Sequence, residues 1–181
     1  YEVLGNDYIS YDELIHLKDI EYIVERYYND SVFRNSLEYM SRFYTSPYDM
    51  YDNIAGYFKK KGYFALGISQ SKLYSILAEF VPDERFKDYL KLDYFINTHN
   101  PSTPVWALEP FDKTLLKTRF VLIEEAIKAG ELSEYEDVPL KEVIKSVQAE
   151  RFSYDVLGNG EKRNNVILFD KKYKRVISAK E

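Results

Sequence analysis

Apolar side chains recur at helical spacing along most of the chain, and the strongest such pattern lies between residues 10 and 28. Its apolar positions fall on one side of a helix, at Leu14, Leu17, Ile20, Val24 and Tyr28. Ser10 precedes the stretch as an N-cap residue, and Glu13 follows at the spacing of a capping box. The stretch therefore predicts a core-facing helix.

Caps and breakers divide the following pattern into further helices. Ser46 followed by Pro47 starts a helix that Gly62 ends, and Pro82 separates two more helices. The pattern predicts helices over residues 33–44, 47–61, 73–81, 83–98, 112–129 and 139–147. Residues 100–110 contain three prolines and are predicted to form a loop, and residues 132–137 an acidic surface loop.

The pattern changes after residue 147. Phe152, Tyr154 and Val156 alternate with polar residues, as in a half-buried strand, and residues 166–169 read as a more buried strand beyond a Gly158 to Gly160 turn. A third strand over residues 173–177 stays open. A lone hairpin is marginal in water, so this element is expected to pack on the helices.

These elements predict a mostly α fold. We expect a bundle of six to seven helices over residues 1–147, with a small C-terminal antiparallel β-hairpin or three-stranded β element over residues 148–181 packed on it, in a single domain.

Composition narrows the function classes. The 181 residues carry a formal net charge of −5, which argues against electrostatic binding of nucleic acid. The basic runs at residues 59–61 and 171–175 are interpreted as solvated surface, with a nucleic-acid patch as the alternative. The absence of cysteine excludes thiolate chemistry and iron–sulfur ligation within this sequence. No apolar run reaches the roughly 20 residues that a membrane-spanning helix needs.

Catalytic signals are weak. His16 borders the first apolar stripe and is predicted to be hydrogen-bonded at the edge of the core, with a ligand or proton-transfer role as the alternative; His99 suits a turn or cap. The sequence has no metal-binding histidine spacing and no glycine-rich phosphate motif. The 18 tyrosines follow the helical stripes, which favours packing over redox chemistry. We expect no catalytic, cofactor-binding or metal-binding residue here.

The opening residues 1–29, YEVLGNDYISYDELIHLKDIEYIVERYYN, resemble the start of the domain of unknown function that follows the barrel in a group of cobalamin-binding radical S-adenosylmethionine (radical SAM) proteins. The similarity is densest over residues 1–44 and continues through KLDYFIN, ERFSYDVL and VILFD. These patterns belong to a structural domain and transfer no active-site residue. The start at Tyr1 without methionine fits a piece excised from a larger protein.

The resemblance implies a parent protein with an upstream cobalamin-binding segment and a radical SAM barrel. That parent would use a [4Fe-4S] cluster, S-adenosylmethionine and cobalamin in the cytoplasm. The domain itself would be a non-catalytic accessory that packs on the barrel and helps to shape or close its substrate site. The rivals are a module that captures a macromolecular substrate, RNA or protein, and a free-standing helical interaction domain.

Two charged residues stand at positions where the helical pattern expects apolar side chains. Asp93 lies among inward residues of the fifth predicted helix, Tyr89, Leu90 and Ile96, and Arg119 among leucines and Ile123 of the sixth. A buried charge is costly unless it is paired. We therefore predict an ion pair between Asp93 and Arg119. In the alternative, one of them faces the radical SAM barrel or its substrate.

Overall fold

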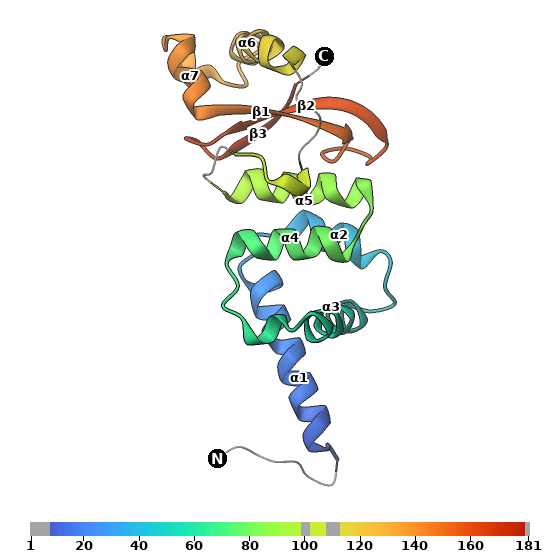
Figure 1. The fold of residues 1–181 in the computed structure, drawn as a ribbon. Helices are drawn as coiled ribbons and strands as arrows, with labels where there is room; N and C mark the ends of the chain where they lie inside the picture. The colour runs from blue at the N-terminus through green and yellow to red at the C-terminus, as the bar shows by residue number, and fades with distance from the viewer. Residues whose placement is uncertain (1–7, 99–101, 108–112, 180–181) are drawn as a thin grey trace. The chain divides into compact units, whose positions relative to one another are not determined.

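The structure, a computed structural model, describes residues 8–98, 102–107 and 113–179, with side chains from Thr118 onward in the helix that begins at Lys113. Seven α-helices and a three-stranded antiparallel sheet in these ranges confirm the predicted fold class (Figure 1). The chain divides into two compact units, Tyr1–Pro82 and Asp83–Glu181. We call them the N-terminal unit and the C-terminal unit.

The described part of the N-terminal unit is helical. Its elements are α1 (Tyr11–Val24), a π-helical turn (Glu25–Asn29), α2 (Arg34–Ser41), α3 (Pro47–Lys61), a 3₁₀ turn (Tyr63–Ala65) and α4 (Gln70–Phe80). The predicted caps are present: Ser10 and Glu13 form the capping box of α1, and Gly62 ends α3 with a left-handed φ of 69°. Local signals thus mark the start of α1 and the end of α3.

Aromatic rings fill the core of the N-terminal unit. Tyr27 and Phe33 pack edge to face with ring centroids 4.9 Å apart, and Phe33 lies 4.3 Å from Tyr74. Both buried tyrosine hydroxyls donate to backbone carbonyls, that of Tyr27 to Leu73 at 3.2 Å and that of Tyr74 to Val32 at 3.0 Å. These contacts confirm the predicted packing role of these tyrosines.

The C-terminal unit combines helices with the sheet. Its elements are α5 (Glu84–Asn97), a 3₁₀ turn (Val105–Ala107), α6 (Lys113–Lys128), a second 3₁₀ turn (Ser133–Tyr135), α7 (Leu140–Ser146), β1 (Val147–Tyr154), β2 (Lys162–Asp170) and β3 (Arg175–Ala179). The strand order is β1-β2-β3 with antiparallel neighbours. The third strand, left open by the sequence, is therefore present.

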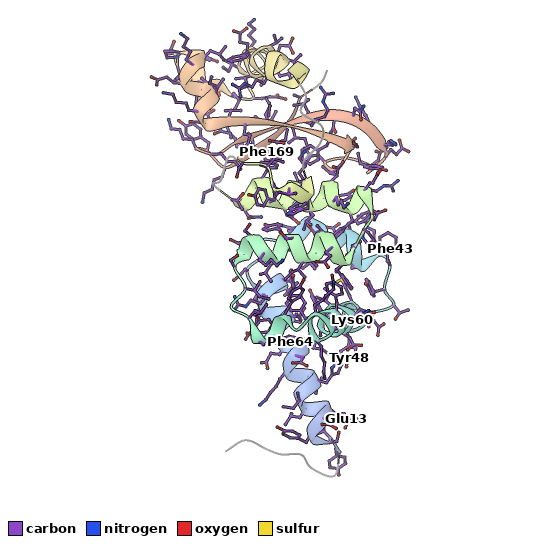
Figure 2. The ribbon with its side chains drawn as sticks, viewed as in Figure 1. Glu13, Phe43, Tyr48, Lys60, Phe64 and Phe169 are labelled. Carbon is purple, nitrogen blue, oxygen red and sulfur yellow. The ribbon has the colours of Figure 1, made fainter. Side chains whose placement is uncertain are left out.

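Helices cover both faces of this sheet, with α5 on one side and α6 and α7 on the other (Figure 1). Val166 and Leu168 of β2 share a core cluster with Ile123 of α6. On the opposite face, Phe169 lies towards α5, its ring centroid 5.3 Å from that of Phe95 (Figure 2). Burial on both faces explains why residues 166–169 read as a continuous apolar run instead of an alternating one.

The division into a helical part up to residue 147 and a β part after it stays a prediction, and the compact units divide elsewhere, between Pro82 and Asp83. The C-terminal unit begins at Asp83 because α5 covers one face of the sheet and α6 and α7 cover the other. The sheet is thus the middle layer of the C-terminal unit.

Several side chains differ from their predicted burial. Leu132 and Tyr135 are buried, so the prediction that residues 132–137 form only a surface loop was wrong. Leu17, Tyr28 and Ile96 were expected to face inward but are 41%, 62% and 43% exposed, because the buried face is narrower than the apolar stripe. None of the helices in the described ranges is long and apolar enough to cross a membrane.

Candidate functional site

The two residues predicted to form an ion pair lie on helices at opposite faces of the sheet. Asp93 on α5 is 1% exposed, as the pattern predicted for an inward charge. Arg119 on α6 is half-buried, with its guanidinium 4.9 Å from the centre of the Phe120 ring. The ion pairs between described residues include none that joins the two. The pairing therefore stays a prediction.

His16 has a structural partner. Its Nε2 lies 2.6 Å from Oδ1 of Asp52, which joins α1 to α3 at the edge of the core. This contact confirms the predicted hydrogen-bonded histidine. In the described part of the chain, no three histidine, cysteine or acidic side chains gather as a metal site would require. His99 lies outside the described residues.

Two charges on α5, Asp88 and Lys91, bind strand β1. Oδ2 of Asp88 accepts from the backbone N–H groups of Ser153 at 2.8 Å and Tyr154 at 2.9 Å, where the register of β1 shifts. The Lys91 ammonium donates to the carbonyl of Arg151 at 2.8 Å. Both charges satisfy backbone groups that an irregular strand would otherwise leave unpaired.

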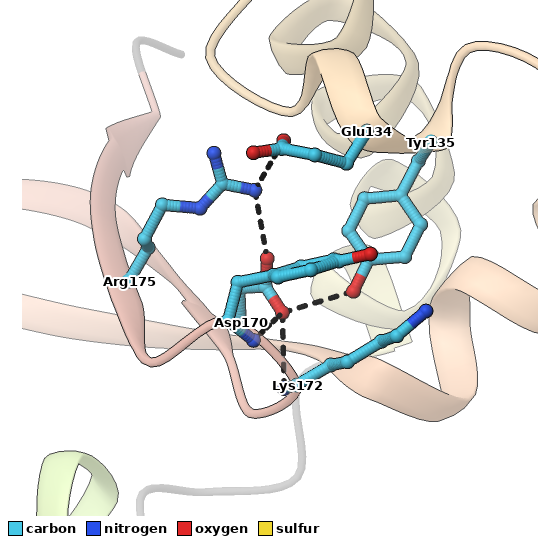
Figure 3. Close-up of polar contacts among 6 residues, drawn as sticks. Glu134, Tyr135, Asp170, Lys172 and Arg175 are labelled. Carbon is cyan, nitrogen blue, oxygen red and sulfur yellow. Dashed lines mark hydrogen bonds and ion pairs between the residues drawn. The ribbon is translucent and has the colours of Figure 1, made fainter.

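The turn between β2 and β3 is held by a buried carboxylate, Asp170, which is 1% exposed (Figure 3). Its Oδ1 accepts from the hydroxyl of Tyr135 at 2.9 Å and from the backbone N–H groups of Lys172 and Tyr173 at 3.1 and 3.2 Å. Its Oδ2 lies 3.1 Å from Nη2 of Arg175. Burial, together with the bond to this carboxylate, raises the pKa of Tyr135 to about 12.

Arg175 also binds Glu134, with 2.7 Å between Nη2 and Oε2. The hydrogen bond to Glu134 raises the pKa of Arg175, and burial opposes this rise. One guanidinium therefore links β3 to the turn on one side and to the segment before α7 on the other (Figure 3).

Lys171 connects the same turn to the end of α5. Its ammonium donates to the carbonyl oxygens of Phe95 and, at 3.0 Å, of Thr98, which the end of the helix leaves without intrahelical partners. A cation suits the negative end of the helix dipole. Burial lowers the pKa of Lys171. The sequence had assigned this lysine to solvated surface, and that assignment was wrong because its partners come from a distant helix.

A pocket of about 210 Å³ lies between the last turn of α5 and the β2–β3 turn. Its lining is aromatic and aliphatic at Phe95, Phe169 and Val176, and polar at the turn; the remaining lining residues are Ile96, Asn97, Asp170, Lys171, Lys174 and Arg175. The sequence did not reveal this pocket, although the basic run at residues 171–175 contributes three of its side chains.

Comparisons with known proteins place the chain in a family. Residues 1–169 match the model of a family described as Protein of unknown function (DUF4080). Searches of curated proteins and of solved structures found no match. The match covers the whole N-terminal unit and most of the C-terminal unit, and it ends before the β2–β3 turn and β3.

Proposed function

Because the chain belongs to the DUF4080 family of unknown function, we propose that it is the non-catalytic C-terminal accessory domain of a cobalamin-binding radical SAM enzyme. It would pack on the upstream barrel of the same chain and help to shape or close the substrate site. The resemblance of residues 1–44 to the domain that follows such barrels motivates this assignment. The [4Fe-4S] cluster, S-adenosylmethionine and cobalamin would all be held upstream, in a cytoplasmic enzyme.

The contacts of four charged side chains in the C-terminal unit support the non-catalytic part of the proposal. Asp88, Lys91 and Lys171 bind backbone groups, and Asp170 binds two backbone amides and two side chains. A catalytic acid or base needs to reach a substrate proton. Charged side chains that connect helices, strands and turns are better suited to stabilising the fold than to catalysis.

The exposed aromatic side chains support packing against another protein surface. Among described residues, those of the N-terminal unit that are at least half exposed are Tyr8, Tyr11, Tyr28, Phe43 and Tyr48. Tyrosine and phenylalanine are enriched at protein interfaces, where they bury large areas. The barrel of the parent is the partner that we propose for them.

The first test uses the parent chain, which includes everything upstream of Tyr1. After purification without oxygen, its iron content, its visible absorption and its reductive cleavage of S-adenosylmethionine would be measured. We expect an iron–sulfur spectrum, bound cobalamin and cleavage. Replacing the three cluster cysteines of the parent by alanine provides the control and should abolish cleavage. No cluster and no cleavage after reconstitution would overturn the proposal.

A second experiment tests the packing role against the capture of a protein substrate. A photo-reactive phenylalanine analogue would replace Phe43 in the parent, with the same analogue at exposed Leu157 as the control. We expect a cross-link from position 43 to the barrel of the same chain. Cross-links from position 43 only to a separate substrate protein would favour the capture module instead.

A further inference from the structure

The pocket between α5 and the β2–β3 turn presents more hydrogen-bond donors than acceptors. Three cations line it, Lys171, Lys174 and Arg175, against one carboxylate, Asp170. That carboxylate is already bound by Tyr135, two backbone amides and Arg175. Arg175 is also paired with Glu134 at 2.7 Å, so the positive charge that remains in the lining is that of Lys171 and Lys174.

The donors in this pocket are only partly used. The ammonium of Lys171 has three N–H donors and gives two of them to the carbonyls of Phe95 and Thr98. Lys174 makes no hydrogen bond or ion pair to any described residue. Nε of Arg175 is buried without a hydrogen-bond partner in the described part of the chain. Donors in this state favour an anionic acceptor.

The backbone holds Lys174 in place at the pocket. Its φ is 53°, a left-handed conformation that costs energy for a residue with a side chain. Asp170, which binds the amides of the two preceding residues, fixes the turn around it. The turn therefore fixes the backbone from which the Lys174 side chain extends at the pocket.

The rest of the lining is apolar and suits a small hydrophobic body. This apolar part of the lining consists of the rings of Phe95 and Phe169 and the side chain of Val176. Cavities of about 150 Å³ accept benzene, so the 210 Å³ found here has room for a ring that carries a carboxylate.

We propose that this pocket binds a small organic anion, with its carboxylate at Lys171, Lys174 and Arg175 and its apolar body against Phe95 and Phe169. The site lies within the C-terminal unit and is independent of the parent enzyme proposed above.

The test is a titration of the isotopically labelled 181-residue chain with benzoate, followed by NMR shifts of backbone amides. We expect saturable shifts confined to the amides of residues 95–98 and 169–176, with a dissociation constant on the order of 1 mM. Benzamide, a neutral molecule of the same shape, and inorganic phosphate, an anion without an apolar body, should each bind more weakly.

Two variants on the same turn separate the pocket from general surface charge. Lys174→Asn removes the unpaired ammonium with a residue that tolerates the left-handed conformation, and should weaken benzoate binding about threefold to fivefold. Lys172→Asn removes the same charge from a side chain that does not line the pocket, and should change the dissociation constant by less than about twofold.

Four results would overturn the proposal. These are the absence of saturable shifts, benzamide binding as tightly as benzoate, phosphate binding as tightly as benzoate, and equal weakening by Lys174→Asn and Lys172→Asn. The first result would show that there is no binding site, and the second that the site does not prefer an anion. The third would show that the apolar lining does not contribute to binding. The fourth would show that general surface charge, and not the pocket, is responsible for binding.

Discussion

The two compact units stabilise their cores in different ways. In the N-terminal unit, contacting aromatic rings fill the core, and the buried tyrosines Tyr27 and Tyr74 donate to neutral backbone carbonyls. In the C-terminal unit, the core also contains charges. Every charged residue that is buried in the described part of the chain lies there: Asp88, Lys91, Asp93 and Asp170.

The difference follows from architecture. A helix satisfies its own backbone, so helices that pack on helices can present an apolar or aromatic face. A small sheet with a shifted register and a tight turn leaves N–H groups that need partners, and Asp88 and Asp170 supply them. The C-terminal unit should therefore be more sensitive to the loss of one charge than the N-terminal unit to the loss of one hydroxyl.

The largest expected effect is that of Asp170→Ala. The change leaves the hydroxyl of Tyr135 and two amides without their acceptor and leaves Arg175 paired with Glu134 alone, and should cost about 3–5 kcal/mol of unfolding free energy. Tyr27→Phe, the matched change in the N-terminal unit, removes one neutral hydrogen bond and should cost about 1 kcal/mol. Urea unfolding followed by circular dichroism and by fluorescence of the single tryptophan, Trp106, measures both. Equal losses of unfolding free energy in the two variants would contradict the proposed difference between the two units.

A smaller effect is expected from glycine substitutions. Gly160 has a φ of 72°, and an added Cβ would lie 2.8 Å from the hydroxyl oxygen of Tyr89, so Gly160→Ala should cost about 1–3 kcal/mol. Gly62 has a φ of 69° with open space around it, so Gly62→Ala isolates the backbone term at about 1 kcal/mol.

Gly67→Ala is the control for this series, because Gly67 has neither a positive φ nor a close neighbour, and should be near neutral. Thermal unfolding of the three variants ranks them. If Gly160→Ala costs no more than Gly62→Ala, the hydroxyl of Tyr89 makes room for the added Cβ without a measurable cost.

The smallest effect concerns alkaline pH. Burial raises the pKa values of Tyr51 and Tyr135, one in each unit, to about 12. Between pH 10 and 12 the unfolded chain therefore binds fewer protons than the folded one, so the stability contributed by these tyrosines is complete below pH 10 and is lost as the pH rises. The expected loss is under about 1 kcal/mol per tyrosine at pH 10.5.

Unfolding free energies of Tyr51→Phe and Tyr135→Phe at several values between pH 8 and 11 test this expectation. Each variant should flatten the fall in stability with pH, because phenylalanine has no proton to lose. A slope that neither substitution changes would show that other groups control the alkaline limit.

Much of the fold could be predicted from local patterns. Helical spacing with Ser10, Ser46, Gly62 and Asp83 as caps gave the helices of the N-terminal unit and α5 within a few residues. These signals act over a few positions, which is why one sequence suffices to find them.

The polar contacts of the C-terminal unit could not be predicted in the same way. Asp170 and Lys171 follow an apolar run and look like the start of an exposed turn, and their partners Tyr135 and Thr98 lie far away along the chain. Asp93 was recognised as an inward charge, but helical spacing cannot indicate which side of a sheet its helix will cover.

The most direct test of the proposed accessory role compares the intact parent with a parent that ends just before Tyr1. We predict that the truncated protein, checked for folding by circular dichroism, keeps its iron–sulfur spectrum, cobalamin and uncoupled cleavage of S-adenosylmethionine. Cleavage coupled to substrate should fall, because in the proposed role this domain helps to shape the substrate site. Loss of the cluster or of all cleavage from a folded truncated protein would contradict a non-catalytic accessory role.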